Sequence, residues 1–333
     1  MADPPCSVVS ATLDEPVFGT ASIVHAWLLV EQPGSWGRDA LFESRLPVSV
    51  ARALVRQADR HHVRLLLIRR PDRTRVTGGR HCFAVSSRRP APPPSEPATA
   101  PPHLAPATAP RHLAPATAPW IEQRRFDDPT ELLDVDFAAL GAGERSFGPG
   151  AGHNEPLYLV CTNGRHDPCC AQFGRPVLRA LASPRVWESS HLGGERFAGN
   201  LVCLPHGVYY GRVDPSTAPA IADQYAQGRV DLDHYRGRAG DAFVVQAAEF
   251  YLRRAEGLLG VDDVTPLRRT SLGNGLVAVE LATADGRRFE AHVALRPGDP
   301  ARPLTCTATT ARRPPAFALV DLFPLPPPGP AVQ

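Results

Sequence analysis

Four of the seven cysteines in this 333-residue chain lie between positions 161 and 203, in a stretch that also holds a histidine closely followed by two glycines. Sulfur and imidazole nitrogen are the ligands that zinc and iron-sulfur centres take from proteins, and carboxylates join them at some sites. The potential ligands in the stretch are Cys161, Cys169, Cys170, Cys203, His191 and Glu195. Their density predicts a site that binds a metal ion or a cluster.

The local sequence predicts how these ligands are presented. An apolar run at residues 157–160 is typical of a strand, and it leads into Cys161. We expect a helix to begin just after Cys170, so that both sulfurs lie at one end of a sheet, where a helix N-terminus favours the thiolate form that metals bind. Two of the three residues between His191 and Glu195 are glycines, which excludes a regular helix and predicts a tight curl that lets both side chains close around an ion.

The overall charge of the chain restricts its partners. The net charge is only +2, and the arginines are interleaved with acidic residues. This pattern predicts no binding to nucleic acid or to a membrane surface, so we expect a small molecule or a protein as partner. The N-terminus carries acids and prolines where a signal peptide has a basic and then an apolar segment, and no apolar run reaches transmembrane length. These features predict a cytoplasmic protein.

The number of cysteines also bears on their role. An odd number of cysteines in a reducing cytosol argues against a disulfide framework. Metal binding, thiol chemistry and simple burial remain as reasons for the chain to carry them. We interpret Cys6, Cys82 and Cys306 as isolated, buried residues.

The chain divides into three predicted regions. Residues 1–89 form an α/β lobe without ligands, and residues 90–119 form a proline- and alanine-rich linker in which HLAPATAP occurs twice. Residues 120–333 form the ligand-bearing domain. In the first lobe, apolar patterns predict a helix started by Pro47 and strands at residues 23–30, 63–68 and 82–85.

The second lobe repeats this order of elements. Its predicted elements are strands at residues 157–160, 186–188, 201–204 and 208–213, with a helix around 176–181. The parallel suggests a degenerate duplication in which only the second lobe carries ligands after its first strand. Asp241 is expected to cap a later helix, and a hairpin with its turn at Asp285 and Gly286 should follow and help to cover the second sheet.

Several segments resemble the sucrase/ferredoxin-like family. They are GTASIVHAWLLVEQPGSWGRDAL and VRLLLIRRPDR in the first lobe, and CTNGRHDPCCAQFGRP, VWESSHLGGERFAGN and LPHGVYYGRV in the second. The resemblance covers most of the chain outside the linker. It implies an α/β fold with a thioredoxin-like ferredoxin lobe, a mixed sheet with flanking helices, preceded by a related, degenerate α/β lobe.

The resemblance also implies a set of ligands. Members of the family that have been studied look like bis-histidine 2Fe-2S proteins, with two cysteines on one iron and both histidines of an H-x-G-G-H motif on the other. By position, Cys161 and Cys170 are the implied sulfur ligands and His191 is the first histidine. Glu195 stands where the second histidine would be, so the chain departs from the family pattern there.

Three outcomes follow from this departure. Glu195 ligates directly, and its negative charge lowers the redox potential relative to a bis-histidine cluster. Alternatively, Cys169 or Cys203 supplies the fourth ligand. In the third outcome the cluster has been lost and the lobe persists as a scaffold.

The function predicted from these features is that of a 2Fe-2S electron carrier or redox protein, rather than an enzyme with its own substrate, working with a redox partner protein such as a reductase. The chain has no nucleotide-binding glycine loop, P-loop or nucleophile elbow, and no paired carboxylates typical of a glycosidase. Three alternatives remain. They are a thiol-based redox protein that uses the clustered cysteines, a zinc protein whose site is closed by Glu195, and a cluster-free thioredoxin-like scaffold.

Overall fold

The structure of the chain is a computed structural model, and it describes residues 4–71, 79–89 and 118–326. Residues 90–117, which make up nearly all of the predicted linker and its repeat, lie outside the described residues. None of the helices within the described ranges has the length and apolar character needed to cross a membrane.

The first group of elements spans described residues from 4 to 153, so its last part lies past residue 119, in the region predicted as the ligand-bearing domain. Its elements are α1 (Cys6–Thr12), β1 (Ala26–Glu31), α2 (Val48–His61), β2 (Val63–Arg69), β3 (Arg80–Ser86), β4 (Trp120–Phe126), η1 (Pro129–Asp134), α3 (Phe137–Ala142) and β5 (Gly152–His153). The helix predicted from Pro47 is confirmed, because Pro47 occupies the N-cap of α2, and Val50 and Leu54 recur at helical spacing on its buried face. The three predicted strands are confirmed as β1, β2 and β3, although β1 begins a few residues later than expected.

The second part of the chain adds two groups of elements. They are β6 (Leu157–Cys161), α4 (Pro168–Leu181), β7 (Val186–Ser189), η2 (Glu195–Phe197), β8 (Leu201–Leu204), β9 (Val208–Tyr210), α5 (Ala218–Ala226), β10 (Tyr235–Arg238), α6 (Phe243–Glu256), β11 (Val264–Gly273), β12 (Leu276–Thr283), β13 (Arg288–Pro297) and β14 (Pro315–Leu325). The four strands predicted between residues 157 and 213 correspond to β6, β7, β8 and β9.

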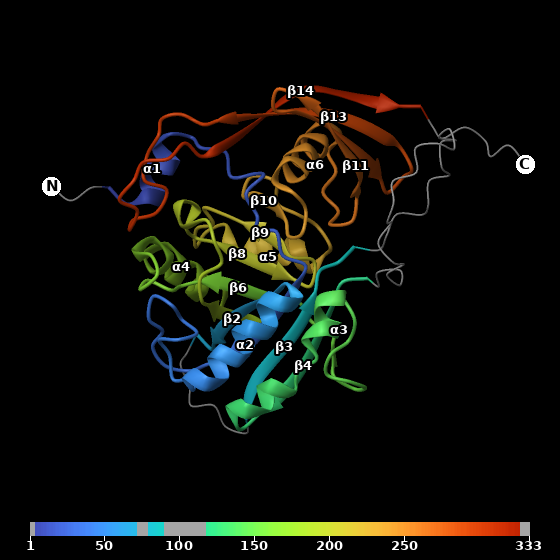
Figure 1. The fold of residues 1–333 in the computed structure, drawn as a ribbon. Coiled ribbons are helices and arrows are strands. Elements are labelled where there is room, and N and C mark those ends of the chain that lie inside the picture. Colours follow the sequence, from blue (N-terminus) through green and yellow to red (C-terminus); the bar gives the residue numbers. More distant parts are fainter. Residues whose placement is uncertain (1–3, 72–78, 90–117, 327–333) are drawn as a thin grey trace, which may run out of the picture.

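A single ten-stranded mixed sheet runs through both lobes, in the order β10-β9-β8-β6-β7-β2-β1-β3-β4-β5 (Figure 1). In the first lobe β1 pairs in parallel with β2 and antiparallel with β3, which in turn pairs antiparallel with β4. In the second lobe β6 bears the same relation to β7, β8 and β9. The repeated strand order supports the predicted kinship of the two lobes, whereas the thioredoxin-like description stays a prediction.

A second sheet of four antiparallel strands, β11 to β14, follows in the chain. The predicted hairpin is confirmed as β12 and β13, and the peptide N–H of Thr283 donates to the carbonyl of Arg287 across its turn. Helix α6 packs Val245 and Leu252 against this sheet, and Figure 1 shows α6 between the small sheet and β10. The mixed α/β class is therefore confirmed, with the hairpin in a separate sheet rather than over the large one.

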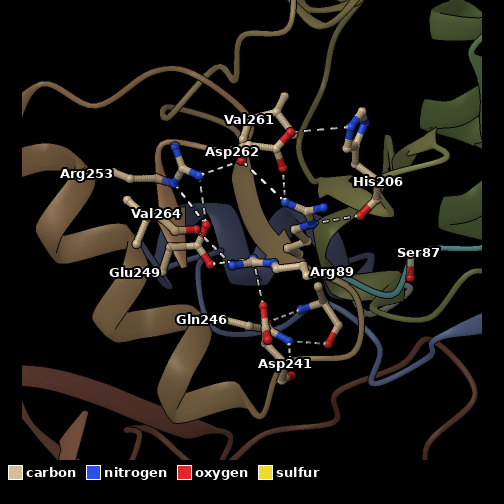
Figure 2. A network of polar contacts seen from close by, with 12 residues as sticks. Ser87, Arg89, His206, Asp241, Gln246, Glu249, Arg253, Val261, Asp262 and Val264 are labelled. Carbon is tan, nitrogen blue, oxygen red and sulfur yellow. Dashed lines mark hydrogen bonds and ion pairs between the residues drawn. The ribbon is translucent and has the colours of Figure 1, made fainter. Parts of the chain in front are cut away.

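Asp241 does not cap α6 as expected. The N-cap is Ala242 and no side chain caps this helix. The carboxylate of Asp241 instead accepts a hydrogen bond from Arg89 at 2.9 Å, and Arg89 also contacts the fully buried Glu249 at 3.0 Å (Figure 2). Arg253 pairs with Glu249 at 2.9 Å. This buried ionic network ties the end of the first lobe to α6, and it competes with the local capping interaction that the sequence suggests.

Candidate metal centre

The carboxyl ends of four strands meet at the junction of the two lobes. Strands β2 and β7 pair antiparallel only through their last residues, with Ile68 opposite Ser189, and Cys161 at the end of β6 lies beside Ser189 in register. The side chains of Arg69 and Glu188 form an ion pair of 2.7 Å across the junction. Because all four strands end here, the loops that follow β1, β6 and β7 begin close together.

Helix α4 begins earlier than the sequence predicts. Asp167 is its N-cap, and its carboxylate accepts a hydrogen bond from the backbone N–H of Cys169 at 2.9 Å. Cys169 and Cys170 therefore lie in the first turn of the helix rather than before it. Gly174 lets α4 pack closely on β6, because a Cβ there would lie 2.0 Å from the carbonyl oxygen of Cys161. The helix start is thus held directly above the end of the strand.

The first turn of α4 brings one sulfur to the strand end. The ligand atoms of Cys161, Cys170 and His191 lie within 4.8 Å of one another, with both cysteines buried and His191 partly exposed. The neighbouring Cys170 thiol and His191 ring hold the pKa of Cys161 well below its usual value, although burial opposes the shift. The same contact and burial raise the pKa of Cys170. The pair is therefore poised with one sulfur as a thiolate, the form that binds metals.

A second group of potential ligands shares His191. The Nε2 atoms of His166 and His191 each lie 3.3 Å from Glu195 Oε1, and the two imidazole rings stack at 3.8 Å. Burial opposes ionisation of Glu195, but His166 and His191 outweigh it and lower the pKa of this carboxyl to about 2. Glu195 in turn raises the pKa of His166. Sequence reasoning missed His166, although it lies in the same short loop as Cys161 and Cys170.

The predicted glycine curl between His191 and Glu195 is confirmed. Gly193 and Gly194 have φ angles of +91° and +78°, which residues with a side chain rarely adopt. A Cβ on Gly194 would also lie 2.4 Å from a nitrogen of Arg236. The curl is what turns the Glu195 side chain back toward His191.

Polar side chains from distant elements fix the backbone of this curl. Its four successive carbonyls each accept a hydrogen bond, from Arg64 to His191, from Ser22 to Leu192, from Arg236 to Gly193 and from Asn200 to Gly194. The bonds measure 2.8 to 3.1 Å. The loop that carries His191 and Glu195 is therefore held in one conformation before any ligand binds, which is the arrangement that a rigid metal site needs.

The other cysteines named from the sequence lie elsewhere. Cys203 is fully buried on β8 among apolar residues such as Tyr158 and Val208, and burial raises its pKa well above the usual value. Cys169 contacts Cys6 and Cys306 rather than Cys161. The prediction that Cys6 and Cys306 are isolated is therefore wrong. Within the described residues, Cys203 joins none of the groups that could hold a metal ion.

Two clefts open beside the group. One, of about 440 Å³, is lined by His166 and His191 together with charged residues of the first lobe. The other, of about 1060 Å³, lies between the loops that follow β1 and β6. Five arginines line this second cleft: Arg45, Arg69, Arg80, Arg165 and Arg175. The histidine side of the group thus faces open space, whereas its sulfur side faces the protein interior.

The donor set suits an iron-sulfur cluster or a zinc ion. Two cysteines on one side and imidazoles on the other are the ligands of a 2Fe-2S cluster of mixed ligation. His191 Nδ1 is buried and has no hydrogen-bond partner among the described residues, which is unfavourable unless a ligand takes it up. These observations support a bound group at Cys161, Cys170 and His191.

Comparisons with known proteins identify a family and a distant relative. Residues 17–237 match the sucrase/ferredoxin-like family. The altered inheritance of mitochondria protein 32 of Eremothecium gossypii is 28% identical over an alignment of 140 residues, and the match covers 33% of this chain and 45% of that protein. The chain thus spans less than half of this relative. No solved structure matches the chain.

Proposed function

The chain belongs to the sucrase/ferredoxin-like family, and we propose that it carries a 2Fe-2S cluster and transfers electrons. The observation that carries the proposal is the convergence of Cys161, Cys170 and His191 within 4.8 Å at a strand end. Zinc alone would be satisfied by the same three ligands and a fourth donor. The family supports the cluster, because its name links these sequences to ferredoxins.

Two donors are available for the fourth position. The sequence predicts Glu195, and the structure adds His166, whose Nε2 lies 3.3 Å from Glu195 Oε1. His166 Nδ1 lies 3.3 Å from the carbonyl of Arg38. With Nδ1 donating to this carbonyl, His166 can offer Nε2 to a metal when that nitrogen gives up its proton and its contact with Glu195. We therefore place His166 in the fourth position and assign Glu195 as the carboxylate that neighbours both histidines.

When bound, such a cluster supplies one electron at a time at a potential set by its ligands and their neighbours. The chain's own residues account for the rest of the function. Strand β6 and helix α4 enclose the sulfurs and exclude water from them. The fixed curl holds His191, and the Glu195 carboxylate adds a negative charge that favours the oxidised state. His166 and His191 lie at the wall of a cleft, where a partner can approach.

A redox protein is the proposed partner. No acidic residue lines the larger cleft within the described part of the chain, and five arginines do. Such a surface favours a partner with an acidic face, whose approach it would accelerate at low salt. A cytoplasmic location stays a prediction from the sequence, and the named relative is associated by its name with the inheritance of mitochondria.

The test is a reductive titration of the anaerobically purified chain, followed by electron paramagnetic resonance. We expect a reversible one-electron reduction and a signal whose nitrogen hyperfine coupling changes when the protein is labelled with ¹⁵N-histidine. In the matched variants, His166→Ala should abolish this signal and Glu195→Gln should keep it. If Glu195→Gln lost the signal and His166→Ala kept it, the fourth ligand would be Glu195. A reduced protein without nitrogen coupling would contradict histidine ligation altogether.

A thiol-based redox function is the second candidate. It is favoured by the lowered pKa of Cys161 and by the nearness of the Cys170 thiol. That function predicts iron-free protein with a two-electron transition and a disulfide between Cys161 and Cys170, which mass spectrometry of alkylated peptides would reveal. Colourless protein with one zinc held by Cys161 and Cys170 would instead favour the zinc alternative.

A further inference from the structure

Three cysteines that are far apart in the sequence meet on the outer side of α4. Cys6 begins α1, Cys169 lies in the first turn of α4, and Cys306 lies in the connection between β13 and β14. Figure 1 shows this connection beside α1. Because Cys169 and Cys170 are adjacent in a helix, their side chains leave it in different directions, and Cys169 contacts this second group while Cys170 contacts Cys161.

The three sulfurs form a closed triangle. Their separations are 3.7 Å between Cys6 and Cys169, 3.2 Å between Cys169 and Cys306, and 3.5 Å between Cys306 and Cys6. Zinc binds thiolates at about 2.3 Å in a tetrahedron, so two of its sulfur ligands stand about 3.8 Å apart. The triangle is therefore close to the size that a single tetrahedral ion requires.

A carboxylate lies at the edge of the triangle. Asp167 Oδ2 is 4.0 Å from the Cys6 sulfur, and Asp167 is completely buried. Backbone N–H groups orient it, since Cys306 donates to Oδ2 at 2.7 Å and Cys169 donates to Oδ1 at 2.9 Å. The ligand atoms of all four residues lie within 4.8 Å of one another. Asp167 thus offers an oxygen as fourth ligand.

The surroundings of the Cys169 sulfur suit a thiolate. The Ser7 hydroxyl donates a hydrogen bond to the Cys169 sulfur at 3.1 Å. Cys6 and Cys169 are buried, and Cys306 is exposed, so an ion has a route from solvent to the triangle. Hydrogen bonds to sulfur and to a ligand carboxylate are the usual outer contacts of a protein metal site.

We propose that Cys6, Cys169, Cys306 and Asp167 form a second metal site, which binds one zinc ion. A disulfide would join two of the sulfurs and leave the third without a role, whereas all three sulfurs and a buried carboxylate converge here. Bound zinc would add a link between three segments that are far apart in the chain, namely α1, the start of α4 and the β13 to β14 connection.

The experiment measures zinc and cobalt in the full-length chain. Protein purified with reductant should contain one zinc per chain, and Cys306→Ser should lose it while iron content and the visible spectrum stay unchanged. Cys203→Ser is the matched control, since Cys203 is a buried cysteine outside both groups, and it should keep the zinc. Adding Co²⁺ to metal-free wild-type protein should give the intense absorption of cobalt bound to thiolates, and Cys306→Ser should reduce it severalfold.

Several outcomes would overturn the proposal. Wild-type protein that contains no zinc and takes up no Co²⁺, with all three thiols open to alkylation, would show that the cysteines only pack together. A disulfide among Cys6, Cys169 and Cys306 in protein purified without reductant, together with absence of metal, would show a redox pair instead. Zinc that Cys306→Ser retains would place the ion elsewhere. These results are independent of iron and sulfide content, so they leave the proposed cluster untouched.

Discussion

The two halves of the large sheet share a strand order but differ in the loop that follows the first strand. After β1, the loop contains Trp36, which is buried, donates its indole N–H to the carbonyl of Gln32 and stacks beneath the guanidinium of Arg69 at 4.1 Å. After β6, the corresponding loop contains His166 and leads directly into Cys169 and Cys170. The first loop fills its space with an aromatic ring, and the second surrounds its space with ligands.

This difference shows that the fold places both loops at the same junction, and that the residues of each loop determine whether it can bind a metal. Both loops start at strand ends that meet at the same junction, because β2 and β7 pair through their last residues. In the first lobe α2 starts at a proline N-cap. In the second lobe α4 starts at Asp167, directly at the cysteines. The connection between β6 and α4 is short, and this brings the Cys170 sulfur to Cys161.

The largest expected effect is loss of the cluster on removal of a second-lobe sulfur. Cys161→Ser and Cys170→Ser should each abolish the visible absorption and the bound iron, because two sulfurs are needed on one iron. Iron and sulfide assays measure the effect. Cys82→Ser is the matched control on β3 of the first lobe, and it should keep the full cluster. A normal cluster in the double variant C161S/C170S would show that the second-lobe sulfurs do not bind it.

The next effect concerns the ring in the first loop. Trp36→Ala should lower the free energy of unfolding by about 3 to 5 kcal/mol, because it leaves a cavity where a large buried side chain was. Iron content per folded chain should stay unchanged. Denaturant titration and iron assay on the folded fraction test this. Phe42→Ala, in the same loop and partly exposed, should cost below about 1 kcal/mol. Loss of iron in Trp36→Ala would mean that the first loop also supports the cluster.

A third test addresses the curl that carries the histidine. Gly194→Ala should cost roughly 2 to 3 kcal/mol, since it adds a close contact with Arg236 to the strain of positive φ. It should also reduce cluster loading, because the curl sets the position of His191. Gly257→Ala has a similar φ of +67° and open space around it, so it should cost only about 1 kcal/mol. If thermal melting showed equal losses of stability in Gly194→Ala and Gly257→Ala, the contact with Arg236 would add nothing to the cost of the Gly194 substitution.

The smallest effect is electrostatic. In Glu195→Gln the cluster should remain and its potential should rise by on the order of 50 mV, or about 1 kcal/mol, because a nearby negative charge is removed. Redox titration against mediators measures the shift. Glu155→Gln, in the segment before β6, changes the charge by the same amount outside the groups that could hold a metal, and it should shift the potential much less. An unchanged potential in Glu195→Gln would place the carboxylate away from the cluster.

Much of the fold could be predicted because its signals are local. The apolar period of α2 and its proline start, the strand runs of β2 and β6, and the glycine curl at Gly193 and Gly194 are each contained in a few neighbouring residues. The start of α4 differs from the prediction, because the helix begins at the Asp167 cap, before the two cysteines, and not after Cys170. Asp241 failed as a cap because its carboxylate pairs with Arg89, which is 152 positions away in the chain.

The potential ligands also divide into those that have a local signal in the sequence and those that do not. Cys161, Cys170, His191 and Glu195 could be named from spacing and family resemblance, since they occur in short motifs. His166 could not, because its role depends on a stacking contact with His191 from another loop. Cys6 and Cys306 are separated by 300 positions, and only the tertiary fold brings their sulfurs to 3.5 Å. Contacts between segments far apart in the chain leave no pattern in a single sequence.

The most direct test of the cluster is to purify the full-length chain without oxygen after expression with ample iron, and to measure its visible spectrum with its iron and acid-labile sulfide. We predict brown protein with about two irons and two sulfides per chain, in addition to the zinc of the proposed second site. Colourless protein with neither iron nor sulfide, although folded, would contradict the cluster at Cys161, Cys170 and His191.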